Sequence, residues 1–144
     1  MTRLEYLLDT DVCIAIIRSK NDSLIRKVVT QELEQLSVSS ITVAELEYGV
    51  AKSSNPEKNA CALMQFLEPF RIRHFDEKAA FCYGKIRASL EIQGEQIGPL
   101  DTLIASQAVA EKLVMVTNNY REFGRIKELS IESWCEIDCS DLLS

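Results

Sequence analysis

The sequence predicts an α/β fold with a short, mostly parallel central sheet. Apolar runs of strand length alternate along the chain with longer stretches whose apolar residues recur at helical spacing. Strands separated by helices are typical of a parallel sheet that carries helices on both faces. The chain has 144 residues, 47% of them hydrophobic, and no internal repeat or linker, so residues 1–144 are expected to form a single domain.

In the first third of the chain, apolar runs predict the strands and polar residues predict the helix starts. Asp11 is expected to cap a short first helix, and Asp22 is expected to open a longer helix with an apolar stripe. Thr42 is expected to begin the helix after the second strand. The expected elements are a strand over residues 5–8, a helix over 12–18, a helix from 22 whose stripe reaches 36, a strand over 36–39 and a helix over 42–52.

The remaining two thirds continue the same alternation of strands and helices. Pro56 suits the first turn of a helix, and Asp76 is a suitable N-cap for another. A glycine-flanked loop over residues 93–99 separates that second helix from the next one. The expected elements are a helix from 56 to about 67, a strand over 70–75, a helix after 76 to about 90, a helix over 100–111, a strand over 113–117 and a last strand over 131–135.

Composition excludes several classes of protein. No apolar run approaches the roughly 20 residues that a membrane span needs, and the N-terminus lacks the pattern of a signal peptide, so a cytoplasmic protein with no membrane association is expected. The five cysteines form no CxxC pair, which argues against a zinc knuckle. A net charge of −6 argues against a general nucleic-acid coat, but not against a nuclease whose metal supplies positive charge.

Basic residues are expected to form a local rim around an acidic centre, although each one alone is more simply explained as part of a solvated helix face. These residues are Lys52, Arg71, Arg73, Lys85, Arg87, Arg121, Arg125 and Lys127.

Four acidic residues follow separate apolar stretches. Asp9, Glu45 and Asp101 each lie at or near the start of an expected helix, and Glu122 follows the strand over residues 113–117. Helix starts after parallel strands share one edge of the sheet, so these side chains are expected to converge. Converging carboxylates repel one another, and a hard divalent cation with oxygen ligands is the simplest way to hold them together.

Each carboxylate also has a purely structural interpretation. Thr42 and Glu45 fit a capping box, in which Glu45 would only bind the backbone at the start of its own helix. Asp9 or Asp11 would cap the first helix, Asp101 would be an ordinary acid of a first turn, and Glu122 would simply be exposed. Taken singly these interpretations are favoured, whereas the common placement of the acids favours a site.

Four segments carry a specific resemblance to a known family, in order and over nearly the whole chain. They are residues 7–14 (LLDTDVCI), 39–49 (SSITVAELEYG), 97–105 (IGPLDTLIA) and 116–123 (VTNNYREF). Together they resemble the four motifs of PIN-domain ribonucleases and, more narrowly, of the VapC toxins of bacterial toxin–antitoxin pairs. The first motif departs from the usual pattern, because Asp11 stands where these toxins usually have Asn.

The resemblance implies a PIN-like three-layer α/β/α fold and a metal-dependent endoribonuclease. Asp9, Glu45 and Asp101 would hold Mg²⁺ or Mn²⁺, which activates water for attack on the phosphodiester. Many relatives place the fourth acid at the position of Asn119, but here Glu122 is assigned to it. Thr117, Asn119 and the unusual Asp11 would surround the metal ligands and position them.

The resemblance also implies partners. The substrate would be RNA, such as a tRNA cut in a single-stranded loop. A cognate VapB-like antitoxin would occupy the active-site groove, and the toxin would form a homodimer.

Two other functions remain open at this point. Asp9 and Asp11 resemble the nucleophile motif of haloacid-dehalogenase-like phosphatases, and residues 114–118 resemble their threonine strand, but the tail lacks a convincing lysine and acidic pair after that strand. A catalytically inactive PIN scaffold is the non-enzymatic alternative, against which the retention of all three metal-ligating acids argues. The only histidine, His74, lies far from every motif and is expected to have an ordinary structural role.

Overall fold

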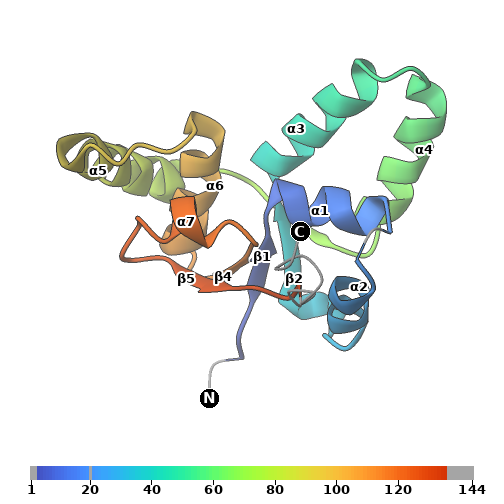
Figure 1. The fold of residues 1–144 in the computed structure, drawn as a ribbon, viewed down its shortest axis with the longest axis horizontal. Coiled ribbons are helices and arrows are strands. Elements are labelled where there is room, and N and C mark those ends of the chain that lie inside the picture. Colours follow the sequence, from blue (N-terminus) through green and yellow to red (C-terminus); the bar gives the residue numbers. More distant parts are fainter. Residues whose placement is uncertain (1–2, 20, 136–144) are drawn as a thin grey trace, which may run out of the picture.

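A five-stranded parallel sheet forms the centre of the computed structural model, which describes residues 3–19 and 21–135. The strand order is β3-β2-β1-β4-β5, and every neighbouring pair is parallel (Figure 1). The short parallel sheet predicted from the sequence is therefore confirmed. The strands are β1 (Tyr6–Leu8), β2 (Leu36–Ser39), β3 (Arg71–Arg73), β4 (Val114–Val116) and β5 (Ser130–Glu132).

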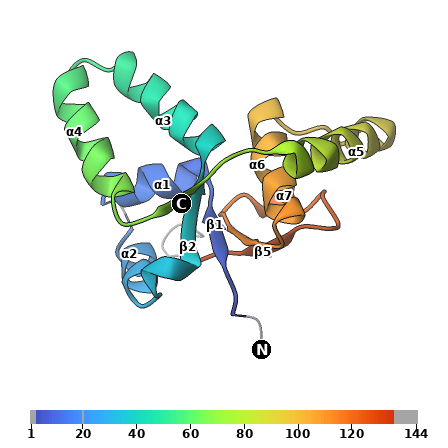
Figure 2. The ribbon, with the colours of Figure 1, turned by 180° about the vertical axis from the view of Figure 1, so that it is seen from behind.

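Helices connect the strands and cover both faces of the sheet. Seen from the front and from behind, α1 to α4 gather on one side and α5 to α7 on the other (Figures 1 and 2). Within residues 3–19 and 21–135, no helix has the length and apolar character needed to cross a bilayer. The helices are α1 (Thr10–Ile17), α2 (Asp22–Val29), the 3₁₀ turn η1 (Leu33–Gln35), α3 (Ser40–Ala51), α4 (Pro56–Leu67), α5 (Glu77–Gln93), α6 (Pro99–Ala110) and α7 (Tyr120–Phe123).

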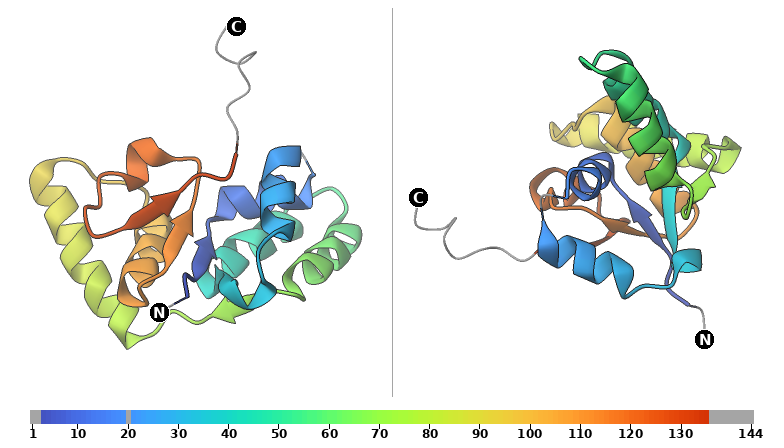
Figure 3. Two further views of the ribbon diagram at one scale, coloured as in Figure 1. Left: turned by 90° about the horizontal axis from the view of Figure 1, so that it is seen from below. Right: turned by 90° about the vertical axis from the view of Figure 1, so that its right-hand side faces the viewer.

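Two apolar clusters, one on each face of the sheet, fill the space between the layers. Side chains of a strand alternate between its faces, so Tyr6 and Leu8 join the cluster under α1 to α4, while Leu7 joins the cluster under α5 and α6. The views from below and from the side show the helices on either side of the strands (Figure 3). The predicted three-layer α/β/α arrangement is confirmed.

The helices α1 and α3 begin two residues earlier than the sequence predicts, whereas α2 begins at Asp22 as predicted. Asp9, rather than Asp11, caps α1, and Ser39, rather than Thr42, caps α3. In both places the cap directly follows a strand, so the chain turns into a helix as soon as it leaves the sheet. Asp11 and Thr42 consequently lie within the first turns of their helices.

The long helix predicted from Asp22 is wrong in its second half. Asn21 caps α2, which ends at Val29, and the η1 turn follows before β2 begins. Leu24 and Val28 form the buried stripe of α2, whereas Val29, its last residue, is 73% exposed. The chain leaves the helix at this point and enters the sheet at Leu36.

The predictions also differ from the structure near the end of the described residues. The short helix α7 was not predicted, because its four residues are too few to show a helical period. The last strand ends at Glu132 rather than at 135, and Trp134 turns away to pack edge-on against Tyr6, with ring centroids 4.9 Å apart. The last cysteine, Cys139, lies outside the described residues; of the other four, only Cys13 is fully buried.

Arg73 connects β3 to β2, to the residue before β1 and to the residue after α6. Its guanidinium is 7% exposed and donates to Ser37 Oγ at 2.9 Å, Glu5 Oε2 at 3.0 Å and Glu111 Oε1 at 3.2 Å. Arg73→Met should lower the free energy of unfolding by about 2–3 kcal/mol, because two carboxylates and a buried hydroxyl lose their partner. Urea unfolding measures the effect.

Arg87→Met is the matched control for Arg73→Met. Arg87 pairs with Glu91 on the exposed face of α5, where water replaces the lost partner, so its loss should change stability little. Equal effects of the two substitutions would contradict a structural role for Arg73.

Candidate active site

Asp9 stands at the carboxyl end of the central strand β1. Its carboxylate is only 4% exposed and accepts a hydrogen bond from the Val12 amide at 2.7 Å, which caps α1. The register pairs Leu8 with Val38 of β2 and with Val116 of β4, so all three strands end at the same edge. Asp9 therefore lies at the edge of the sheet on which the acids were predicted to converge.

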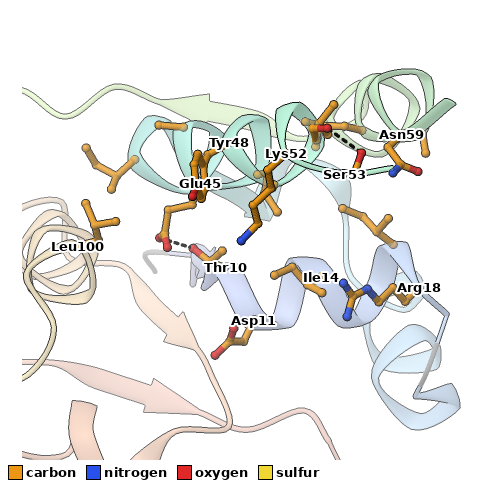
Figure 4. Close-up of a pocket in the computed structure, with 18 residues that line it drawn as sticks. Thr10, Asp11, Ile14, Arg18, Glu45, Tyr48, Lys52, Ser53, Asn59 and Leu100 are labelled. Carbon is orange, nitrogen blue, oxygen red and sulfur yellow. Dashed lines mark hydrogen bonds between the residues drawn. The ribbon is translucent and has the colours of Figure 1, made fainter. Parts of the chain in front are cut away.

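Glu45 faces the start of α1 rather than its own helix. Because Ser39 caps α3, Glu45 lies in the second turn and cannot close a capping box with Thr42, so that structural interpretation is wrong. Instead, Glu45 Oε1 accepts a hydrogen bond from Thr10 Oγ1 at 2.8 Å (Figure 4). Thr10 Oγ1 also lies 3.1 Å from Thr42 Oγ1, so a hydroxyl pair joins α1 to α3 beneath this carboxylate.

Asp101 lies in the first turn of α6. This helix leads through a short turn into β4, so it runs back along the sheet and begins near the carboxyl ends of the strands. Gly98 is the N-cap and makes no side-chain capping bond, while Pro99 occupies the first turn. Asp101 is half-buried, and its Oδ2 would lie 3.6 Å from a Cβ placed on Gly98.

Glu122 is held at the start of α7 by its neighbours. Asn119 caps this helix: its Oδ1 accepts from the Glu122 amide at 3.3 Å and its Nδ2 donates to Glu122 Oε2 at 3.2 Å. The Asn119 amide in turn donates to Thr117 Oγ1 at 3.0 Å. Thr117 and Asn119 therefore link the end of β4 to the fourth acid.

The carboxylates act on one another electrostatically. Burial and, after it, the charges of Glu45, Asp11 and Glu122 together raise the pKa of Asp101 to about 6. The pKa of Asp9 is also raised to about 6, because burial outweighs the hydrogen bonds from Thr117 and Val12 that lower it, and the charges of Asp11 and Asp101 add to the rise. All five acids named from the sequence thus share one region of negative potential.

No Lys or Arg within residues 3–19 and 21–135 forms an ion pair with these acids. The ion pairs of that part of the chain involve other acids, at Glu5, Glu32, Glu91 and Glu111. In the same residues, no group of three or more Asp, Glu, His or Cys side chains is already arranged as a metal-binding cluster. The site is therefore a convergence of uncompensated carboxylates rather than a closed coordination sphere.

A groove of about 760 Å³ runs along α3 from Asp11 and Glu45, whereas Asp9, Asp101 and Glu122 are not among the residues that line it. Thr10, Asp11 and Glu45 line one end of it, and α1, α3 and α4 form its walls (Figure 4). From these two carboxylates the groove leads along α3 toward Lys52 and Ser53. Of the eight basic residues in the predicted rim, Lys52 lines it.

The family model of the PIN domain matches residues 6–129 of this chain, a range that includes all five acids. The chain belongs to the PIN-domain family. This match confirms the resemblance drawn from the four sequence motifs.

Among PIN domains, the chain groups with the VapC ribonucleases. It is 41% identical to the tRNA(fMet)-specific endonuclease VapC of Salmonella typhimurium over 132 residues, which cover 92% of this chain and 99% of the relative. It is 42% identical to Ribonuclease VapC2 of Rickettsia felis over 130 residues, or 90% of this chain and 97% of the relative. These relatives support a nuclease and give no support to the phosphatase or scaffold alternatives.

Solved structures of VapBC complexes share the fold of this chain. DNA-bound VapBC from Salmonella typhimurium superposes with a TM-score of 0.87 at 41% identity and covers 92% of this chain and 100% of that chain. VapBC2 from Rickettsia felis, bound to a promoter DNA fragment, gives a TM-score of 0.85 at 40% identity, covering 91% of this chain and 99% of that chain. The PIN fold predicted from the sequence is confirmed.

One residue of this PIN-domain site, Thr10, was not predicted from the sequence. Thr10 follows Asp9 directly and holds Glu45 from a position 35 residues away in the sequence. The available signal in the sequence was a pair of threonines. Thr10 is next to Asp9, and Thr42 lies three positions before Glu45. Their pairing depends on how α1 packs against α3, which no local pattern shows.

Raising the pH should destabilise the metal-free protein through Asp9. Its pKa is raised from 3.8 to about 6 by burial, so the folded state holds this proton more tightly than the unfolded state. The resulting stability is fully present below pH 3.8 and is lost as the pH rises through about 6, by at most about 3 kcal/mol. Asp9→Asn keeps the cap and should remove this loss.

Urea unfolding in chelator at pH 5 and pH 7.5 tests the prediction for Asp9. Wild type should lose more stability between the two pH values than Asp9→Asn. The same pH dependence in both proteins would contradict a buried, uncompensated Asp9 carboxylate.

Proposed function

We propose that this protein is a VapC-type toxin, a metal-dependent endoribonuclease that hydrolyses RNA with metal-activated water. The observation that supports this most is the pair of buried or half-buried carboxylates, Asp9 and Asp101, whose pKa values are both raised to about 6 by burial and neighbouring charge. A protein gains nothing in stability from such an arrangement. It is explained if the site serves to bind a cation.

The residues fit a hard divalent cation. Asp9, Glu45 and Asp101 offer only oxygen donors, which Mg²⁺ and Mn²⁺ prefer, and no thiolate or imidazole of the described residues belongs to the site. When bound, such an ion lowers the pKa of water and neutralises charge that develops on the phosphate. Mg²⁺ or Mn²⁺ is therefore the proposed cofactor, and these three acids its proposed ligands.

The surrounding residues have positioning roles in this proposal. The Thr10 hydroxyl holds Glu45, and the Thr117 hydroxyl lowers the pKa of Asp9, which favours its charged form. Asn119 orients Glu122, the proposed fourth catalytic acid. Asp11 is exposed at the mouth of the groove and adds negative charge next to the ligands.

The comparisons suggest the substrate and the partner. The Salmonella typhimurium relative is named as specific for tRNA(fMet), so a structured RNA such as a tRNA is the proposed substrate. The similar solved structures are VapBC complexes, which supports a cognate VapB-like antitoxin as partner. We infer one PIN-like domain over residues 1–144 and an activity located in the cytoplasm, where RNA is found. The homodimer implied by the resemblance stays a prediction.

The ends of the cleaved RNA test the chemistry. Attack by metal-bound water should leave a 5′-phosphate and a 3′-hydroxyl, and His74→Ala should cleave as wild type does, because His74 lies outside the site. Kinase and phosphatase labelling of the products identifies the ends. Cleavage in EDTA that yields 2′,3′-cyclic phosphate would contradict the proposal, since the ribose would then be the nucleophile. Turnover of aryl phosphates without RNA cleavage would favour the phosphatase alternative.

A further inference from the structure

Among the residues of α3 and its C-cap that line the groove, three charged or aromatic side chains lie at helical spacing. Glu45, Tyr48 and Lys52 are separated by three and four positions, which places them on one face of the helix. Figure 4 shows the three side chains along the same wall, with Glu45 nearest Thr10. The stripe thus begins at the acidic site and extends about 10 Å along the helix axis.

Tyr48 offers an aromatic face inside this groove. Its side chain is 65% exposed, which is unusual for a large aromatic residue of a helix wall. Lys52 Nζ lies 4.9 Å from the centre of its ring, so a positive charge accompanies the aromatic face. Aromatic faces next to cations are the common means by which proteins hold single-stranded nucleic acid.

Two basic residues line the groove beyond Tyr48. Lys52, the C-cap of α3, and Arg18, the C-cap of α1, lie on opposite walls; the Lys52 ammonium points back toward Thr10, and Arg18 lies farther along α1 (Figure 4). Neither forms an ion pair with any residue in the described ranges 3–19 and 21–135. Along α3 the groove therefore passes from an acidic end to an exposed aromatic ring with an unpaired cation against it, and Arg18 is a second unpaired cation on the facing wall.

We propose that α3 is the binding track for single-stranded RNA on one side of the scissile bond, with a base stacked on Tyr48 and a phosphate held by Lys52 and Arg18. This inference rests on the proposed ribonuclease function, because it takes the acidic end as the point of cleavage. The order of groups matches the substrate: a metal site for the scissile phosphate, a π-face for the adjoining base, and cations for another phosphate. Much of the remaining lining is apolar and suits a segment of the antitoxin as the other candidate occupant, but an apolar segment does not account for the exposed ring and the two unpaired cations.

Binding of RNA to an inactive variant tests the track without requiring cleavage. The probe is a fluorescein-labelled single-stranded oligoribonucleotide, titrated with Asp101→Asn protein in Mg²⁺ and followed by anisotropy. In this background, Tyr48→Ala should raise the Kd about tenfold, and Tyr48→Phe should restore most of the affinity because it keeps the ring. Lys52→Gln should raise the Kd severalfold and reduce the slope of log Kd against log salt by about 0.7.

An equivalent pair on another helix supplies the control. Lys85 Nζ lies 4.5 Å from the ring centre of the exposed Phe81 on α5, away from the groove. Lys85→Gln makes the same change in net charge as Lys52→Gln and should leave the Kd and the salt slope unchanged. Equal effects of the two lysine substitutions would overturn the track, because they would show only a general charge effect.

Kinetics and the protein partner complete the test. In otherwise active protein, Tyr48→Ala and Lys52→Gln should raise KM for RNA and leave kcat within about twofold, as expected for residues that bind but do not react. If wild type cleaves RNA while both variants keep the wild-type KM and Kd, the track is wrong and the ribonuclease stands. Variants that lose only inhibition by the antitoxin protein would likewise overturn it, by assigning the groove to that partner. Failure of wild-type protein to bind the oligonucleotide in Ca²⁺, which is expected to bind with poor turnover, would do the same.

Discussion

Asp101→Asn is expected to abolish RNA cleavage, by at least about a hundredfold, while the protein remains folded. The substitution removes one charge and almost no volume from a half-buried position that makes no capping bond, so nothing in the fold depends on the carboxylate. Because burial and neighbouring acids raise its pKa, the variant should be at least as stable as wild type without metal. Cleavage of RNA in Mg²⁺ and thermal unfolding in chelator measure the two effects.

The other proposed ligands should behave in the same way. Asp9→Asn keeps the cap of α1, whereas Asp9→Ala should also cost about 1 kcal/mol of stability. Glu45→Gln should lose activity, and Glu47→Gln, an exposed neighbour on α3 that does not line the groove, should keep it. Wild-type activity in Asp101→Asn would refute the site. So would equal losses from Glu45→Gln and Glu47→Gln.

The strands and the acids were predictable because both depend on local sequence. The apolar strands β1 and β4 end where polar residues begin, and a parallel sheet brings such ends to one edge. Asp9 follows from that rule, whereas α3 begins at Ser40, two residues before its predicted start at Thr42. Asp101 follows from the preceding Pro99, which sets the first turn of α6.

What could not be predicted depends on contacts between distant segments. Asp9 and Asp11 are both acceptable N-caps, and the choice is made by where β1 ends in the sheet. The helix predicted to run from Asp22 was extended too far because Leu33 and Leu36 continue its period, although β2 takes Leu36 into the sheet. The bond from Thr10 to Glu45 joins residues on two helices and leaves no periodic signal.

The structure also shows why the acidic site is compatible with a stable fold. The carboxylates lie at the edge of the sheet, outside both apolar clusters, and the only nearly buried one, Asp9, is bonded to the α1 backbone. Elsewhere the chain pairs its buried charge, as Arg73 shows with two glutamates. Within residues 3–19 and 21–135, a buried charge without an ion-pair partner is thus found only at Asp9, in the region where a cation is proposed to bind.

Chelation is expected to stop cleavage completely, and added Mg²⁺ or Mn²⁺ is expected to restore it. The reason is that Asp9, Glu45 and Asp101 supply only negative charge, so without a cation they repel the scissile phosphate instead of binding it. Ca²⁺ should bind but support poor turnover, because its longer and looser coordination misplaces the attacking water.

Binding of Mg²⁺ or Mn²⁺ should also be visible without RNA, as a rise in melting temperature at pH 7.5 that Asp101→Asn loses. Full cleavage in EDTA, or a rise in melting temperature that persists in Asp101→Asn, would show that the cation acts elsewhere. Loss of both effects in this one variant would instead tie metal binding and cleavage to the same carboxylates at the edge of the sheet.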